Sequence, residues 1–363
     1  MVNFKPTDEQ QLIRETMAGF AREVLRPAAR EADEKNEVPE AVVQRGWELG
    51  LVQSGIPESL GGYGDARSAV SGALILEELA YGDLALALHL LTPRLLTLPL
   101  LMIGTEAQQK RWLPRFAGAE FVAGTAAFAE PRWDFDPTAL ATRAERKGGD
   151  WVLTGQKCLV PLAADAEAIL VYATAPDGLA AFVVERGAAG LTVGERERNM
   201  GIKALATYPV TLDGVRLPAD ARLGGESAYL QPLIDASRVA VAALAVGVGH
   251  AAFDYARDYA KERRAFGMAI AQKQAIAFKL ADMAIEIDAM RLLVWEAAWK
   301  IDSGETATRE AVLVKQYASQ SALSIADNAV QVLGGHGYIR EHPVELWLRN
   351  ARGFTTFDGV AIV

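Results

Sequence analysis

The sequence has few of the features that mark secreted proteins. Its 363 residues include one cysteine, Cys158, which cannot form an internal disulfide. The N-terminal residues 1–6 lack the apolar core of a signal peptide. Together these absences predict a cytoplasmic protein.

Long hydrophobic runs and excess positive charge are also missing. The most apolar stretch, residues 84–103, is interrupted by His89, Pro93, Arg94 and Pro99, which favours buried helix and turn over a membrane span. A net charge of −9 argues against binding of nucleic acid. His336 and His342 have no companion at ligand spacing, so we expect no metal site.

What is present describes a globular chain long enough for two or three packed domains, with 51% hydrophobic residues and a mean hydropathy near zero. The sequence pattern is helical at first, then β-prone, then helical again, and this order predicts an α+β fold that is mostly α. We expect an all-α domain over 1–118, a β domain over 119–225 and a four-helix bundle over 226–363.

Local patterns support this order. A capping signal at residues 7–10 predicts a helix start. Short β-prone runs at 151–155, 168–172, 181–184 and 208–212 predict a small antiparallel barrel or sandwich. Over 272–301, apolar residues recur four and three apart, which predicts a helix with one buried stripe: Ile276, Leu280, Met283, Ile287, Met290 and Val294. A second helix over 306–333 should run back antiparallel.

Several motifs in the last region resemble the acyl-CoA dehydrogenase family. Residues 263–267 (RRAFG) match its Arg-x-x-Phe-Gly element, and residues 331–338 (QVLGGHGY) precede 341–343 (EHP) and 348–352 (LRNAR). The resemblance extends over nearly the whole chain, and it implies the family's helix, β-domain, helix layout.

The resemblance also implies FAD, bound across a subunit interface, and an acyl-CoA substrate. A cation and close backbone suit the pyrophosphate, an aromatic ring suits adenine, and amides suit polar cofactor groups. The positions that match the family's cofactor tail site are Arg263, Phe266, Gln274, Gln331, Gly334 and Gly335. An electron-transfer acceptor is implied as a further partner.

The half of the site that faces the flavin ring departs from the family pattern. Residues 129–136 read AEPRWDFD where the family usually has TEPGAGSD, so bulky side chains replace small ones. Residues 157–162 read KCLVPL where the family has Lys-x-Trp-Ile-Thr-Asn. Pro161 removes a hydroxyl and a backbone N–H there. We expect protein to fill this pocket.

The catalytic position is altered as well. The family's base is Glu in a Glu-Gly-Thr triplet, and residues 358–360 read Asp-Gly-Val here. Asp358 keeps the carboxylate but is one methylene shorter, and Val360 lacks the hydroxyl. Arg238 is a candidate contact for the substrate, and Ser237 before it offers no alternative base. Because the sequence stops at Val363, we also expect a less enclosed site.

These features favour one hypothesis and leave two alternatives. The first is a degenerate subunit that lends its tail-binding residues to a FAD held by a homologous partner, as in α2β2 enzymes that dehydrogenate steroid or side-chain acyl-CoAs. The second is a homotetrameric acyl-CoA dehydrogenase with Asp358 as base. The third is a binding or scaffold protein without FAD.

Overall fold

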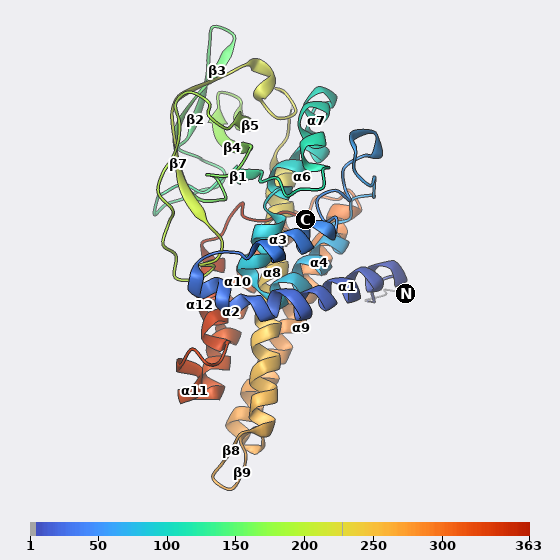
Figure 1. The fold of residues 1–363 in the computed structure, drawn as a ribbon, viewed down its shortest axis with the longest axis vertical. Coiled ribbons are helices and arrows are strands. Elements are labelled where there is room, and N and C mark those ends of the chain that lie inside the picture. Colours follow the sequence, from blue (N-terminus) through green and yellow to red (C-terminus); the bar gives the residue numbers. More distant parts are fainter. Residues whose placement is uncertain (1–4, 227) are drawn as a thin grey trace.

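The computed structural model describes residues 5–226 and 228–363. Residues 1–4, on which part of the signal-peptide argument rests, and Ser227 lie outside the described residues. The β domain sits on one end of the long C-terminal helices, and the N-terminal helices pack along their side (Figure 1).

The N-terminal region is helical, as the sequence predicted. The capping box at Thr7 is present, with the side chains of Thr7 and Gln10 each bonded to the other's backbone N–H. The stretch 84–103 forms two buried helices on either side of a turn at Thr92 and Pro93. The helices are α1 (Asp8–Phe20), α2 (Arg26–Lys35), α3 (Glu40–Glu48), α4 (Ala69–Gly82), α5 (Leu84–Leu91), α6 (Arg94–Ile103) and α7 (Glu106–Trp112).

The β domain contains the four predicted strands and three that the patterns did not reveal. The sheet has the order β1-β4-β2-β3-β7-β6, with β5 paired to β4. It is mixed, because β4 pairs in parallel with β1 and β2, so the expectation of a purely antiparallel module was wrong. The strands are β1 (Thr125–Ala127), β2 (Arg143–Lys147), β3 (Asp150–Pro161), β4 (Ala168–Ala175), β5 (Gly178–Glu185), β6 (Leu191–Val193) and β7 (Thr207–Leu217).

The C-terminal region returns to long helices that pack on one another. The two predicted helices are confirmed as α9 and α10, and the stripe from Met283 to Val294 is buried, with Ile276 and Leu280 half-buried. The helices are α8 (Gln231–Glu262), α9 (Gln274–Asp302), α10 (Thr308–Leu333), α11 (Gly335–Tyr338) and α12 (Val344–Ala351), and the short strands β8 (Arg264–Ala265) and β9 (Met268–Ala269) form a hairpin.

Helix α8 is the centre of the molecule. It packs against α4, α9, α10 and α12. It is long and apolar enough to cross a membrane, but 78% of its apolar window is buried inside the protein. The bent pair α5 and α6 also passes such a test of composition, and most of its residues are buried as well. Burial against neighbouring helices explains the apolar character of both segments.

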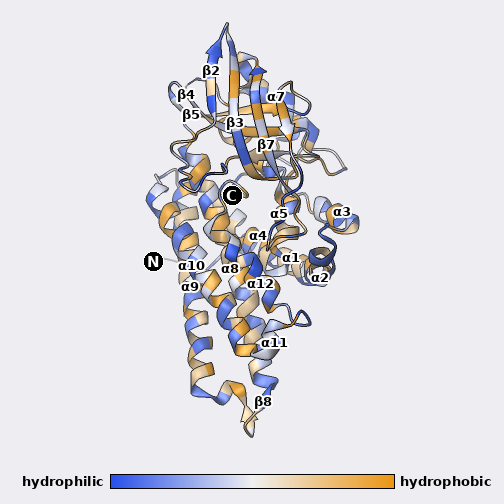
Figure 2. Ribbon diagram, turned by 90° about the vertical axis from the view of Figure 1, so that its left-hand side faces the viewer, coloured by the Kyte–Doolittle hydropathy of each residue, from blue (hydrophilic) through white to orange (hydrophobic). Residues whose placement is uncertain are grey.

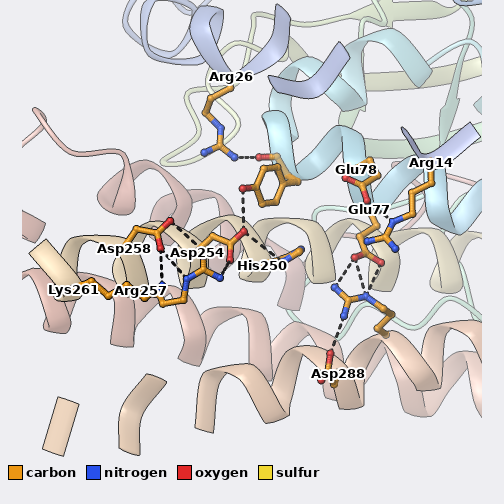
Figure 3. A network of polar contacts seen from close by, with 12 residues as sticks. Arg14, Arg26, Glu77, Glu78, His250, Asp254, Arg257, Asp258, Lys261 and Asp288 are labelled. Atoms are coloured by element: carbon orange, nitrogen blue, oxygen red, sulfur yellow. Dashed lines mark hydrogen bonds and ion pairs between the residues drawn. The ribbon is translucent and has the colours of Figure 1, made fainter. Parts of the chain in front are cut away.

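Polar contacts fasten the N-terminal helices to this bundle (Figure 3). Arg291 of α9 donates to Glu77 of α4 at 2.8 Å, and both side chains are largely buried. The hydroxyl of Tyr81 donates to Asp254 of α8 at 3.1 Å. Such partly buried, charge-assisted bonds are stronger than exposed ion pairs. They fix α4 against α8 and α9.

Candidate cofactor and substrate site

The first part of the expected cofactor arm is the hairpin at the end of α8. Arg263 is the C-cap residue of α8, and its backbone N–H donates to the carbonyl of Tyr259 at 2.8 Å. Phe266 and Gly267 form the hairpin turn with φ of 53° and 82°, the backbone that suits a two-residue hairpin. The Phe266 side chain is 93% exposed, so its ring is available for stacking.

The second part is formed by the ends of α9 and α10. Gln274 opens α9, Gln331 lies in the last turn of α10, and both are exposed. Gly334 has φ of 58° and ψ of −129°, a backbone conformation that favours glycine. Among the described residues, nothing lies within 4 Å of a Cβ built on Gly334 or Gly335. A ligand can therefore approach this backbone closely.

These residues fit the nucleotide tail of FAD. Arg263 makes no ion pair within the described part of the chain, and its exposed guanidinium suits a pyrophosphate. The hairpin and α11 lie at the end of the bundle that is far from the β domain (Figures 1 and 2). All six predicted positions are exposed, whereas a ligand site usually buries roughly 70–90% of its ligand. The six positions of the predicted tail site therefore lie on an open surface of this chain.

The segment expected to face the flavin ring is anchored by a buried ion pair. Lys157 Nζ lies 3.0 Å from Glu130 Oε1 and 3.0 Å from the carbonyl oxygen of Phe128. Glu130 also accepts from the N–H groups of Ala141 at 2.6 Å and Thr142 at 2.8 Å. Burial lowers the pKa of Lys157 to about 8, and the charge of Glu130 opposes this shift. The anchor fixes where residues 129–136 begin.

Beyond this anchor the segment carries the large side chains that the sequence revealed. Phe135 packs edge-on against Phe128, with ring centroids 5.8 Å apart. Arg132 donates to both carboxylate oxygens of Asp134, at 3.0 and 2.8 Å. Trp133, in contrast, is 98% exposed. The crowding therefore comes from Phe135, while the indole of Trp133 points into solvent.

Two backbone N–H groups at the end of β3 have hydrogen-bond partners within the protein. The N–H of Leu159 donates to the Glu197 carboxylate at 3.1 and 3.2 Å, and that of Leu162 donates to the Ala206 carbonyl at 2.8 Å. Pro161 has no N–H and is buried. Leu159 and Leu162 both have positive φ, 53° and 49°, which is uncommon for residues other than glycine. The donors of this segment are thus used within the protein.

Asp358 lies at a small cavity between the β domain and the helices. The cavity volume is about 20 Å³, which holds about one water molecule. Its walls are mostly apolar and come from α6, α8, the β domain and the C-terminal segment, among them Leu95, Pro99, Tyr172, Ser237 and Ile362. Residues 360–363 are all buried, and Ala361 and Ile362 line the cavity.

The carboxylate of Asp358 is balanced between burial and nearby cations. Burial raises its pKa above the usual value, while the charges of Lys315 and then Arg238 oppose this shift. Lys315 Nζ of α10 lies 3.5 Å from Asp358 Oδ2. The structure therefore brings the predicted base and the predicted substrate arginine into electrostatic contact. A deprotonated carboxylate here is the form that can accept a proton.

Gly359 explains how the Asp358 turn fits against the β domain. Its φ is 69°, and a Cβ built on it would lie 2.6 Å from Cβ of Phe128. The Phe128 ring packs against Tyr172, with centroids 4.9 Å apart. Glycine is required here both for the backbone conformation and for the close approach. Val360 is buried and offers only an apolar surface.

The cofactor arm and the Asp358 cavity are far apart in one chain. The chain end, marked C in Figure 1, lies where the β domain meets the helices, and the hairpin β8–β9 lies at the opposite end of the bundle. One dinucleotide cannot be served by both ends of the same α8, because the 32 residues of this helix span about 48 Å. The two predicted parts of the site are therefore separated from one another within one chain.

Comparisons with known proteins agree with this architecture. Three family models match the chain: the N-terminal domain of acyl-CoA dehydrogenase at residues 7–120, its middle domain at 125–215 and its C-terminal domain at 227–361. A Bos taurus short-chain specific acyl-CoA dehydrogenase is 36% identical over 98% of this chain and 87% of its own length. An acyl-CoA dehydrogenase of Bacillus subtilis is 34% identical over 97% and 95%.

Solved structures give the same result. The butyryl-CoA dehydrogenase of Megasphaera elsdenii superposes with a TM-score of 0.89 at 31% identity, covering 99% of this chain and 96% of its own. A glutaryl-CoA dehydrogenase of Mycobacterium smegmatis gives 0.86 at 31% identity, covering 99% and 93%. The chain belongs to the acyl-CoA dehydrogenase family.

Sequence reasoning did not identify Lys315 and Tyr172 as neighbours of the Asp358 cavity. Lys315 precedes Asp358 by 43 residues along the chain, and no motif around it signals the contact. Tyr172 lies in a predicted strand, but the strand pattern does not say which cavity the side chain lines. Only the packing of β4, α10 and the C-terminal segment brings them together.

Proposed function

We propose that this chain is an FAD-binding subunit of an acyl-CoA dehydrogenase, acting with a homologous partner chain that houses the flavin ring and the catalytic base. The exposed cofactor arm at the end of α8 carries this proposal. The substrate is an acyl-CoA thioester that loses hydrogen from its α and β carbons, and the electrons pass on to an acceptor protein. FAD, when bound, supplies the hydride acceptor.

The residues of the arm have distinct tasks in this proposal. Arg263 neutralises the pyrophosphate, and the exposed ring of Phe266 packs on adenine. The side-chain amides of Gln274 and Gln331 hydrogen-bond polar cofactor groups. The turn at 334–335 lets the cofactor lie against the backbone.

The ring side of this chain supports a non-catalytic role for its own cavity. A volume of about 20 Å³ holds one water and not an acyl chain. Phe135 packs against Phe128, which lines the cavity. At the end of β3, the backbone N–H of Leu162 is hydrogen-bonded within the protein, and Pro161 has no N–H. We infer that the reactive ring of the shared FAD lies in the partner chain.

A surface for such a partner is present on α9. Four large apolar side chains are exposed at intervals of seven residues, which places them on one face of the helix: Phe278, Ile285, Leu292 and Trp299. A repeat of seven is typical of a helix that packs along another helix. An exposed apolar stripe of this kind is usually covered by another protein chain.

A second candidate is a homotetrameric enzyme that uses Asp358 as its base. The position of Asp358 favours it, since the carboxylate lines a cavity beside Lys315 and Arg238. The short-chain and glutaryl-CoA dehydrogenases among the relatives also favour it. In that case residues 360–363 must move to admit an acyl chain.

Purification alone and with candidate partner chains tests both proposals. The first predicts a colourless isolated chain, and one FAD per pair of unlike chains after coexpression. The second predicts a yellow isolated protein that bleaches with an acyl-CoA. A preparation that stays colourless in every combination would contradict both and leave a scaffold without FAD.

Asp358→Asn separates the two proposals in active preparations. If Asp358 is the base, acyl-CoA-dependent bleaching should slow by about a hundredfold or more, because proton abstraction loses its carboxylate. The rate in wild-type protein should also fall as pH drops through the raised pKa of Asp358, since the protonated carboxyl accepts no proton. If the partner holds the base, the variant should keep the wild-type rate. Asp134→Asn is a control, because Asp134 is an exposed aspartate that does not line the cavity.

A further inference from the structure

Two tyrosine–histidine pairs lie beside the cofactor arm. Tyr255 and Tyr259 are one turn apart on α8, so both face the same side. The hydroxyl of Tyr259 lies 2.8 Å from Nδ1 of His336, and that of Tyr255 lies 2.7 Å from Nδ1 of His342. The two imidazoles stack, with centroids 5.3 Å apart and planes inclined by 12°.

The Tyr259–His336 bond joins the two halves of the arm. Tyr259 is bonded through its carbonyl to the N–H of Arg263, and His336 directly follows Gly335. The bond therefore connects segments that are 77 residues apart in the chain. The bond lies between Arg263, which we expect to bind the pyrophosphate, and the turn at 334–335, which we expect to contact the same group.

Helix α11 packs against α10 and α12, and a side-chain hydrogen bond ties it to α8. It is only four residues long, and Tyr338 at its end is 87% exposed. Gly337 packs closely on the backbone carbonyl of Val330. A Cβ built on Gly337 would lie 2.3 Å from that oxygen. The contact with α8 comes from the imidazole of His336. Short helices with little burial depend on such specific contacts.

We propose that His336 is a positioning residue for FAD: held by Tyr259 and stacked on His342, it keeps the turn at 334–335 at a fixed distance from Arg263. This inference rests on the proposed tail-binding function. We assign His336 the tautomer with its proton on Nε2, so that Nδ1 accepts from the Tyr259 hydroxyl. Without this bond, the turn at 334–335 is held less firmly relative to Arg263, and the dinucleotide tail binds more weakly.

The test measures cofactor affinity in the assembly that binds FAD. His336→Ala and Tyr259→Phe should each weaken FAD binding by about five- to tenfold, the effect of one lost hydrogen bond. His336→Asn should restore most of the affinity, because its side-chain oxygen can replace Nδ1 as acceptor. Tyr229→Phe is the control, since this tyrosine is 71% exposed at the other end of α8.

ADP is the second probe, because it carries only the tail of FAD. Its affinity should fall by the same factor as that of FAD in both weakened variants. Binding within twofold of wild type in Tyr259→Phe, or an Asn variant no better than Ala, would overturn the inference. A lower unfolding temperature with unchanged affinity would also overturn it. Wild-type protein that binds neither ligand would instead refute the proposed function itself.

Discussion

At the scale of single residues, burial decides how charges behave in this fold, and Asp83 is a clear case. Asp83 is 3% exposed and caps α5, accepting from the N–H of Leu86 at 2.9 Å. Burial raises its pKa to about 6, against an ordinary value of 3.8, although the backbone bonds oppose this. The pKa of Asp83 is raised in the folded protein. The contribution of this carboxyl group to stability is therefore complete at pH values below its ordinary pKa and is lost as pH rises through 6.

Asp83→Asn should therefore remove this part of the pH dependence. Asparagine keeps the cap but carries no charge, so the variant should be more stable than wild type at pH 7 by about 1–3 kcal/mol. Urea unfolding between pH 4 and pH 7 measures the difference. Asp8→Asn, at an exposed first-turn position, is the matched control. Parallel curves for Asp83→Asn and wild type would refute the assignment.

Arg94 presents the opposite charge in a similar environment. It is 9% exposed, and among residues 5–226 and 228–363 its side chain has no hydrogen bond or ion pair. Burial, and then the like charge of Arg67, lowers its pKa to about 10. An unpaired buried cation costs free energy, so Arg94→Met should raise stability by about 1–4 kcal/mol.

Thermal unfolding of Arg94→Met and Arg67→Met tests this expectation. Arg67 donates to the carbonyl of Val363 at 2.8 Å, so its loss should destabilise the protein and serve as a contrast. A lower unfolding temperature for Arg94→Met than for wild type would contradict it.

At the scale of secondary-structure elements, the sequence predicted what depends on local pattern. The apolar spacing of α9 and the capping signal of α1 were sufficient for those helices. Strand β2 was missed because its residues, RAERK, are mostly charged and exposed and show no apolar alternation. The parallel pairing of β1 with β4 was missed because register between distant segments leaves no local signal.

The Glu130–Lys157 pair is a buried link between β3 and the segment that follows β1. Both side chains are almost fully buried, so removing one partner leaves an uncompensated charge. Lys157→Met should therefore destabilise the protein by about 3–5 kcal/mol. The double variant Glu130→Gln with Lys157→Met should recover part of this loss, which denaturant unfolding can measure. Equal losses in the single and double variants would contradict the coupling.

At the scale of the whole molecule, the candidate site was predictable only where it is contiguous in sequence. The arm residues Arg263, Phe266 and Gly334 lie in short motifs, and the structure places them at one end of the bundle. The partners of Asp358 come from separate elements, so no residue spacing in the sequence could predict the contact with Lys315. The exposure of the arm is likewise a property of the folded surface.

The stripe on α9 gives the last prediction. Replacing Ile285 and Leu292 by glutamate puts two charges into a surface that we expect to be buried between helices, at a cost of several kcal/mol per unpaired charge. The assembly should dissociate into folded single chains, with an unchanged helical circular dichroism spectrum. FAD should be lost in parallel, because the arm and the ring pocket then belong to separate molecules. Sedimentation velocity and flavin absorbance measure both effects on one sample.

Leu12→Glu, a 65% exposed leucine on α1, is the control and should leave assembly and flavin unchanged. If the double variant keeps both its assembly and its FAD, α9 is not the contact through which two chains share the cofactor.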